Sequence, residues 1–123
     1  MSSLPAGDRG AASEDQARFY LETHGLKTLN RNFRTRRGEI DLVMLDSDTL
    51  VFVEVRYRRG NRYGSAAESV SHTKQQRISS AAKQFLRSQK QWSRHPCRFD
   101  VVAISGSGPV HIDWIKDAFR PEG

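Results

Sequence analysis

The sequence contains one cysteine and no long apolar run. The lone Cys97 excludes an internal disulfide and a cysteine-rich zinc site, and it favours a reducing compartment. No segment approaches about 18 consecutive apolar residues, and the N-terminus lacks the apolar centre of a signal peptide. We therefore expect a cytoplasmic protein with no membrane contact. Because Cys97 lies within an apolar run, we expect it to be a small core residue.

Length and charge narrow the class of protein further. A chain of 123 residues fits one compact domain, which we predict over 13–120 behind a flexible N-terminal tail of small residues at 1–12. The 20 Lys and Arg against 14 Asp and Glu give a net charge of +6, which favours a polyanionic partner such as nucleic acid. A cationic surface that serves solubility alone is the alternative.

Periodicity and turn residues predict a mixed α/β domain. The expected elements, in chain order, are helix 13–24, strand 26–29, an arginine-rich turn 31–38, hairpin strands 39–45 and 49–57, a loop 58–71, a helix from Thr73, strand 98–104, short strand 110–112 and a helical turn 113–119. Ser13 with Gln16, and Thr73 with Gln76, have the spacing of helix capping boxes. This order implies a mixed β-sheet flanked by helices.

Several residues are expected to serve the core rather than a site. The second helix carries an apolar stripe at helical spacing, formed by Ile78, Ala81, Ala82, Phe85 and Leu86. Trp114 and Phe119 are expected to be packing anchors near the C-terminus. Asp100 interrupts a strand, but Arg98 lies on the same face of that strand and can pair with it, so we expect a structural role.

Two acidic residues interrupt the apolar strands of the hairpin. An ionised carboxylate in such a place is costly unless it is paired or bound to a metal. A turn centred between Ser47 and Asp48 places Asp41 directly opposite Glu54 on one sheet face, where like charges repel. A divalent cation such as Mg²⁺ or Mn²⁺, bound by both carboxylates, is the simplest way to relieve that repulsion.

A structural ion-pair cluster is the alternative to a metal site. The same hairpin register places Glu39 opposite Arg56. Arg56 or a neighbouring arginine could then neutralise both acids with no metal, and ion-pair networks perturb carboxylates as readily as functional sites do. The residue types alone leave these two interpretations open.

The hairpin resembles a known family. Gly-Glu-Ile-Asp-Leu-Val at 38–43, followed by Val-Phe-Val-Glu-Val-Arg at 51–56, is similar to the YraN-like family of bacterial proteins, which is related to the PD-(D/E)XK nuclease superfamily. Glu14 and the segments 69–75 and 98–102 also match family positions. The resemblance therefore spans nearly everything after the tail.

The resemblance implies a restriction-endonuclease-like αβββαβ core, as in Holliday-junction resolvases and type II restriction enzymes. It implies that Asp41 and Glu54 are metal ligands and that Glu14 is a further acidic ligand or orients water. Arg56 would occupy the lysine position of the motif, and Ile40 stands where the superfamily has proline. A guanidinium stays protonated, so Arg56 cannot act as a general base, although it can hold a phosphate or stabilise transition-state charge.

Basic residues flank the acidic pair on both sides in the sequence. The predicted phosphate contacts are Arg34, Arg36, Arg37, Arg58, Arg59 and Lys74. No metal-binding spacing is found among the histidines, which are His24, His72, His95 and His111. A solvated basic face is the alternative to nucleic-acid contacts.

Three functions remain compatible with these observations. They are a metal-dependent endonuclease or junction resolvase, a non-catalytic nucleic-acid-binding protein with a nuclease-like core, and a protein-interaction adaptor that uses the basic face. DNA is the expected nucleic acid, but the sequence does not separate DNA from RNA. It also leaves open the structure of the substrate and the oligomeric state, with a homodimer among the options.

Overall fold

The computed structural model describes residues 6–58, 70–106 and 110–121. The elements in chain order are α1 (Ala6–Thr23), β1 (Lys27–Arg34), β2 (Glu39–Asp46), β3 (Thr49–Arg58), α2 (His72–Ser88), the 3₁₀ turn η2 (Lys90–Trp92), β4 (Cys97–Ser105) and β5 (His111–Phe119). Most of the predicted loop 58–71 falls outside the described residues. Within the described ranges, neither helix has the length and apolar character that crossing a membrane requires.

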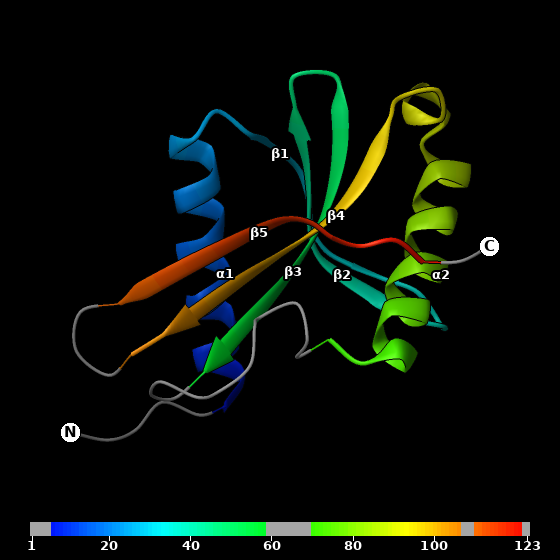
Figure 1. The fold of residues 1–123 in the computed structure, drawn as a ribbon. Helices are drawn as coiled ribbons and strands as arrows, with labels where there is room; N and C mark the ends of the chain where they lie inside the picture. Colours follow the sequence, from blue (N-terminus) through cyan, green and yellow to red (C-terminus); the bar gives the residue numbers. More distant parts are fainter. Residues whose placement is uncertain (1–5, 59–69, 107–109, 122–123) are drawn as a thin grey trace.

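The strands form one five-stranded mixed sheet in the order β1-β2-β3-β4-β5 (Figure 1). β3 and β4 run parallel, with α2 in the connection between them, and the other neighbouring strands are antiparallel. The predicted hairpin is formed by β2 and β3. The predicted α/β class and the order helix, three strands, helix, strand are therefore confirmed, with β5 added at one edge.

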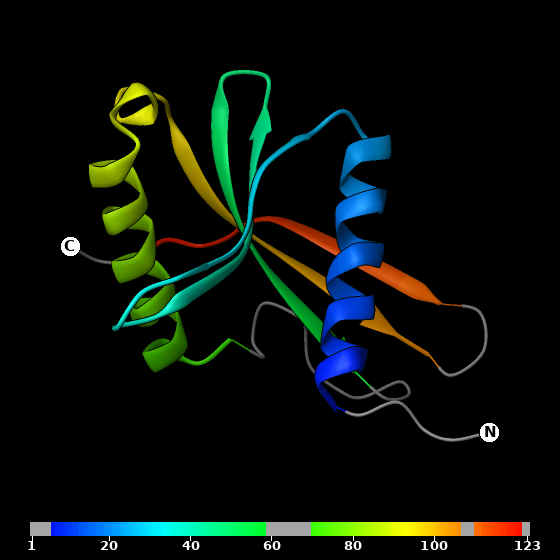
Figure 2. The same ribbon diagram turned by 180° about the vertical axis from the view of Figure 1, so that it is seen from behind.

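α1 and α2 cover opposite faces of the sheet, as the two views in Figures 1 and 2 show. The α1 cluster consists of Ala17, Leu21, Leu26, Leu42, Met44, Val51, Val53, Val102 and Ile104. The α2 cluster consists of Ile40, Val43, Leu50, Phe52, Val70, Ile78, Ala81, Ala82, Phe85, Val101 and Ala103, with Leu86 packed against it. The predicted apolar stripe of the second helix is therefore confirmed as the face that α2 buries.

Both helices begin earlier than predicted. α1 begins at Ala6 rather than Ser13, so the helix runs through Gly7 and Gly10, which local propensity does not favour in a helix. Ser13 is buried within the helix at 5% exposure and is not its N-cap. The N-cap of α2 is Ser71 rather than Thr73, since the Ser71 side chain accepts a hydrogen bond from the Lys74 backbone N–H at 3.1 Å.

Strand pairing overrides the local sequence at two further places. The arginine-rich segment predicted as a turn continues β1, and the turn is confined to 35–38, because β1 pairs with β2 through this polar run. Residues 113–119, predicted as a helical turn, belong to β5 and pair with β4. Trp114 and Phe119 pack against the two cores as predicted. Cys97 is exposed rather than in the core, because it is the first residue of β4.

Asp100 is a fully buried charge that joins β4, β5 and the hairpin. Its carboxylate accepts hydrogen bonds from Arg98 Nε at 3.0 Å, Trp114 Nε1 at 2.9 Å and the Asp117 backbone N–H at 2.9 Å. Arg98 also donates to Asp46 at 2.9 Å. The structural role predicted for Asp100 is therefore confirmed.

Asp100→Ala should lower the free energy of unfolding by about 3–5 kcal/mol, because it leaves a part-buried guanidinium and buried N–H donors without their acceptor. Urea unfolding followed by circular dichroism measures this change. The matched variant Asp113→Ala removes a carboxylate that is 62% exposed beside His111, and it should cost less than about 1 kcal/mol. Equal losses in the two variants would contradict the role assigned to Asp100.

Candidate functional site

The candidate site lies where β2 and β3 separate. The two strands pair in the predicted register as far as Leu42 opposite Val53. Past this pair they diverge toward opposite sides of the molecule, β2 toward α2 and β3 toward α1 (Figure 1). Asp41 and Glu54 are the next residues of the two strands, so both lie at the mouth of this opening, which we call the fork. The register prediction is confirmed up to the fork.

The alternation of side chains along β2 reverses at Asp41. In a regular strand, residues two positions apart point to the same face. Ile40, however, packs in the α2 cluster and Leu42 packs in the α1 cluster. The neighbouring β1 has a matching irregularity, because Asn32 has a left-handed backbone with φ of 53°. Asp41 therefore lies between the two faces, where residues from both sides of the sheet can contact it.

Three acidic side chains meet in the fork. Asp41 Oδ2 accepts a hydrogen bond from the Val55 backbone N–H at 2.8 Å. The side chain thereby replaces the backbone carbonyl that β2 would offer to β3 if the two strands still paired. Glu14 of α1 and Glu54 of β3 each share a hydrogen bond with the Asp41 carboxyl group. The Asn32 amide faces Glu14 and, with its nitrogen turned toward the carboxylate, donates to the two oxygens at 3.2 and 3.0 Å. The structure thus brings together three of the predicted site residues.

Lys74 of α2 contacts the most buried of these acids. The Glu54 side chain is 5% exposed, whereas the Lys74 side chain is 40% exposed. Lys74 Nζ lies 2.8 Å from Glu54 Oε2, which is the distance of a close charge-assisted contact. The contact therefore joins the first turn of α2 to the buried carboxyl group of β3.

Burial and mutual repulsion raise the pKa of two of the carboxyl groups. Burial, then the hydrogen bond and charge of Asp41, raise the pKa of Glu54 to about 8, although Lys74 opposes the shift. Burial and the charge of Asp41 raise the pKa of Glu14 to about 7, and Asn32 opposes that shift. The fork therefore binds protons more tightly than the same carboxyl groups would in water.

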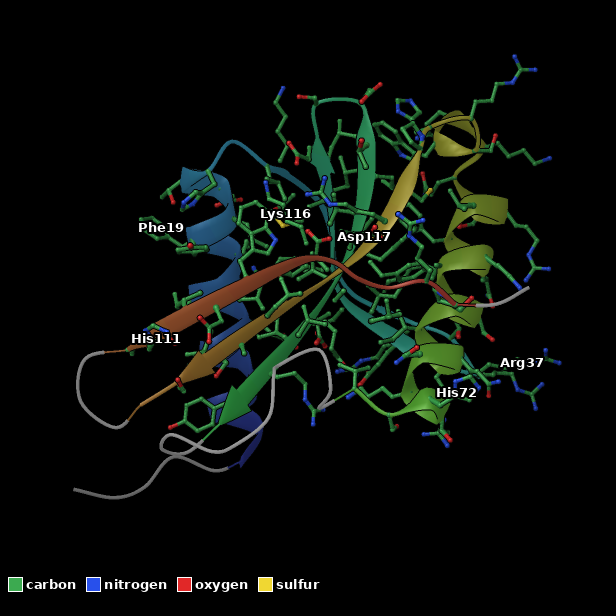
Figure 3. The ribbon with its side chains drawn as sticks, in the orientation of Figure 1. Phe19, Arg37, His72, His111, Lys116 and Asp117 are labelled. Carbon is green, nitrogen blue, oxygen red and sulfur yellow. The ribbon has the colours of Figure 1, made fainter. Side chains whose placement is uncertain are left out.

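A basic groove adjoins the fork. It has a volume of about 810 Å³ and lies between the turn at 35–38 and the start of α2. Its lining residues are Arg34, Thr35, Arg36, Arg37, Gly38, Glu39, Ser71, Thr73, Lys74, Arg77 and Ile78. Figure 3 shows Arg37 and His72 at this same end of the molecule. Four of the predicted phosphate contacts, Arg34, Arg36, Arg37 and Lys74, therefore line one groove.

Backbone contact joins the two walls of the basic groove. A Cβ atom at Gly38 would lie 2.2 Å from the carbonyl oxygen of Arg77, so only glycine fits this approach without a shift of the backbone. Lys74 belongs to the groove lining and also contacts Glu54. The groove therefore leads directly to the acidic side chains of the fork.

Arg56 lies on the same sheet face as Glu54. Arg56 pairs with Ala103 and Glu54 pairs with Val101, and both of these β4 residues pack in the α2 cluster. The predicted position of Glu39 opposite Arg56 is wrong, because β2 and β3 no longer pair beyond Leu42 and Val53. Glu39 instead lies opposite Arg34 of β1, with 3.5 Å between Arg34 Nε and Glu39 Oε2.

The remaining predicted site residues are placed as follows. Arg58 ends β3, but its side chain and the whole of Arg59 lie outside the described residues. The histidines make local contacts away from the fork, as His95 does with the Asp48 carbonyl oxygen. In the described part of the chain, no group of three or more His, Cys, Asp or Glu side chains is arranged to hold a metal ion.

Sequence reasoning missed Asn32 and the pairing of Lys74 with Glu54. A signal for Asn32 did exist, because asparagine is one of the few residues that adopts a left-handed backbone readily. The Lys74 contact had no such signal, since it depends on how α2 packs against the sheet.

The fold and the site define a mixed α/β protein in which buried acidic side chains lie beside a basic groove. A model of the family described as "Uncharacterised protein family UPF0102" matches residues 13–104. A UPF0102 protein of Ectopseudomonas mendocina is 55% identical over 112 residues, which cover 91% of this chain and 94% of the relative. One from Pseudomonas fluorescens is 49% identical over 112 residues, covering 89% and 91%. The chain belongs to the UPF0102 family, and the family part of the sequence resemblance is thereby confirmed.

The stability of the protein in the presence of a chelator should fall as pH rises from 5 to 9. The raised carboxyl pKa values mean that the folded state binds more protons than the unfolded chain in this window, so ionisation at higher pH disfavours folding. Both shifts depend on the same Asp41, and Glu14 is partly screened by solvent, so the two contributions do not add in full and we expect a total loss of a few kcal/mol.

Urea unfolding at several pH values measures this dependence. Glu54→Gln removes the titrating group, so the variant should be more stable than wild type at pH 9 and should show a flatter profile. Asp113→Asn, at an exposed position, serves as the control and should follow the wild-type profile. A wild-type protein that gains stability across this window would refute the account of the fork.

Proposed function

We propose that the chain binds nucleic acid, with DNA as its partner, and that the fork is the centre of a metal-dependent endonuclease acting on branched or otherwise structured strands. The observation that carries this proposal is the position of Lys74, which lines the basic groove and contacts the buried Glu54. A phosphate backbone bound in the groove would therefore lie next to the acidic side chains. The order of α1, β1, β2, β3, α2 and β4 is also the αβββαβ order that the resemblance to PD-(D/E)XK nucleases implies.

The charge of the groove supports a polyanionic partner. The net charge of the chain is +6, and the groove gathers five Arg and Lys side chains with one acid, Glu39. Contacts between such side chains and phosphates release condensed counterions, and this supplies affinity without sequence preference. The groove therefore suits the backbone of a nucleic acid better than a neutral ligand.

The acidic side chains of the fork fit a hard divalent cation, Mg²⁺ or Mn²⁺. Mg²⁺ commonly binds through one or two carboxylates, with waters completing its shell. Glu54 Oε2 is buried and contacts only the mobile ammonium group of Lys74 among the cations of the described residues, at 2.8 Å, so a divalent cation would take the place of that ammonium group. Asp41 and Glu54 would hold the ion, with Glu14 beside them. When bound, a cation of this kind lowers the pKa of a water ligand and stabilises charge on a transferring phosphoryl group.

The protein groups of the fork suit phosphodiester hydrolysis. In that reaction a water oxygen bonds to phosphorus, one ester P–O bond breaks, and the leaving oxygen takes up a proton. Glu14, which lies beside Asp41, can orient the attacking water or accept its proton. Arg56 stays protonated, so on the same face as Glu54 it can hold a phosphate oxygen and cannot act as the base.

A non-catalytic nucleic-acid-binding protein is the second candidate, and the contacts in the fork favour it. Asp41 already accepts the Val55 N–H, and Lys74 already neutralises Glu54. No three metal-ligating side chains of the described residues are arranged as a metal site. On this interpretation the acids and Lys74 form a structural ion-pair cluster, and the groove alone carries the function.

With Mg²⁺ or Mn²⁺, the wild-type protein should cleave a four-way DNA junction and melt at a higher temperature. Metal at 100 times its Kd should add about 2.7 kcal/mol to the free energy of unfolding, because it binds the native state. Asp41→Asn, which keeps an oxygen for the Val55 N–H, and Glu54→Gln should each abolish both effects and retain the fold.

Gel analysis of a branched-DNA panel, together with melting curves in the same buffers, tests this expectation. Arg56→Lys should cut at least as well as wild type, and Asp113→Asn should behave as wild type. If the wild type shows no metal-dependent change in melting temperature and no cleavage, the non-catalytic function replaces the endonuclease.

DNA affinity should fall linearly with salt on logarithmic axes, because the groove neutralises phosphates. Replacing Arg34, Arg36 and Arg37 together by Gln should reduce the magnitude of that slope by about 2 to 3, since each phosphate contact contributes about 0.9. Fluorescence anisotropy of a labelled duplex and a labelled junction at several salt concentrations gives the slopes. A wild type that binds neither DNA at low salt would overturn the nucleic-acid proposal itself.

A further inference from the structure

Lys74 lies between two sites that attract opposite charges. Its Nζ contacts the buried Glu54 at 2.8 Å, while its side chain is 40% exposed and lines the basic groove. Glu54 is one of the three acids that meet in the fork, and Lys74 is the cation that contacts it. The same ammonium group can therefore serve the acids or a phosphate in the groove, and it cannot serve both at full strength.

The structure leaves the Lys74 side chain free to move while its backbone is held. The Ser71 side chain accepts the Lys74 backbone N–H at 3.1 Å, which fixes the residue in the first turn of α2. The Lys74 side chain is 40% exposed, and only its ammonium group contacts Glu54, at 2.8 Å. A lysine has a flexible four-carbon stem, so its ammonium group can exchange one anionic partner for another without a change in the fold.

The charge in the fork decides whether Lys74 contacts Glu54 or a phosphate in the groove. A divalent cation repels an ammonium group about twice as strongly as a monovalent cation at the same distance. A divalent cation on the Glu54 carboxylate therefore weakens the hold of that carboxylate on Lys74. The basic groove, with phosphate present, is the nearest favourable place for the ammonium group.

We propose that Lys74 couples divalent-cation binding in the fork to nucleic-acid binding in the groove. Lys74 holds Glu54 in the metal-free protein, and it turns to a backbone phosphate when Asp41 and Glu54 take a divalent cation. By thermodynamic linkage, each ligand then raises the affinity for the other by the same factor. This inference rests on the proposed function, because it needs both ligands, but it does not need cleavage.

Titrations of wild type and Lys74→Gln test the coupling. Anisotropy of a labelled junction gives the DNA Kd with and without saturating Mn²⁺, with the DNA checked for integrity on a gel, and calorimetry gives the Mn²⁺ Kd without DNA. In wild type, Mn²⁺ should tighten DNA binding about tenfold. In Lys74→Gln the gain should fall below about twofold, and Mn²⁺ alone should bind more tightly than to wild type because a competing cation is gone.

Two further variants separate this role from a general loss of charge or of structure. Arg77→Gln removes a positive charge from the same groove, so it should weaken DNA binding but keep the wild-type coupling factor. Lys74→Arg keeps the charge and should retain the coupling. Circular dichroism and melting curves establish that each variant is folded.

The outcomes distinguish this inference from the proposed function. A wild type that binds neither Mn²⁺ nor DNA would overturn both. A wild type that binds both ligands, with Mn²⁺ leaving the DNA Kd unchanged, would overturn the coupling alone. So would Lys74→Gln with wild-type coupling, or with weaker Mn²⁺ binding, because Lys74 would then be a structural support for Glu54.

Discussion

The separation of β2 from β3 is the constraint on which the candidate site depends. Where the strands part, the Val55 N–H has the Asp41 carboxylate as its acceptor, at 2.8 Å. A buried backbone donor left without a partner would cost about 1–3 kcal/mol, so the sheet itself holds Asp41 in the fork whatever else binds there. Glu14 and Glu54 must then adapt to an acidic group that cannot move away. Burial raises the pKa of both groups, and the fixed position of Asp41 raises the two pKa values further.

A continuous sheet keeps the residues on its two faces apart, and the fork is where that separation ends. α1 supplies Glu14 from one face and α2 supplies Lys74 from the other, yet both reach the same group of acids. The left-handed backbone at Asn32 and the reversal at Asp41 make this possible, because they turn the two strands together at one point. The site is therefore a property of the strand geometry as much as of the acidic residues.

The parts of the structure that follow from local rules could be predicted from the sequence. The hairpin register follows from the apolar strands and their turn, which is why Asp41 and Glu54 could be placed near each other in advance. The buried face of α2 follows from its periodicity in the same way. The paths of β1 and β5 could not be predicted, because backbone pairing with a neighbouring strand outweighs their polar local sequence. The contact of Lys74 with Glu54 could not be predicted either, since it depends on how α2 packs against the sheet.

Because Gly38 contacts the Arg77 carbonyl, the width of the groove and its charge depend on different atoms. Main-chain atoms set the distance between its walls, and side chains set its charge. Arginines can therefore be gained or lost along the rim while the opening keeps its size. A larger residue at position 38 would do the opposite, since it would wedge the turn away from α2 and leave every charge in place. The shape and the charge of this surface are thus determined by different residues of the chain.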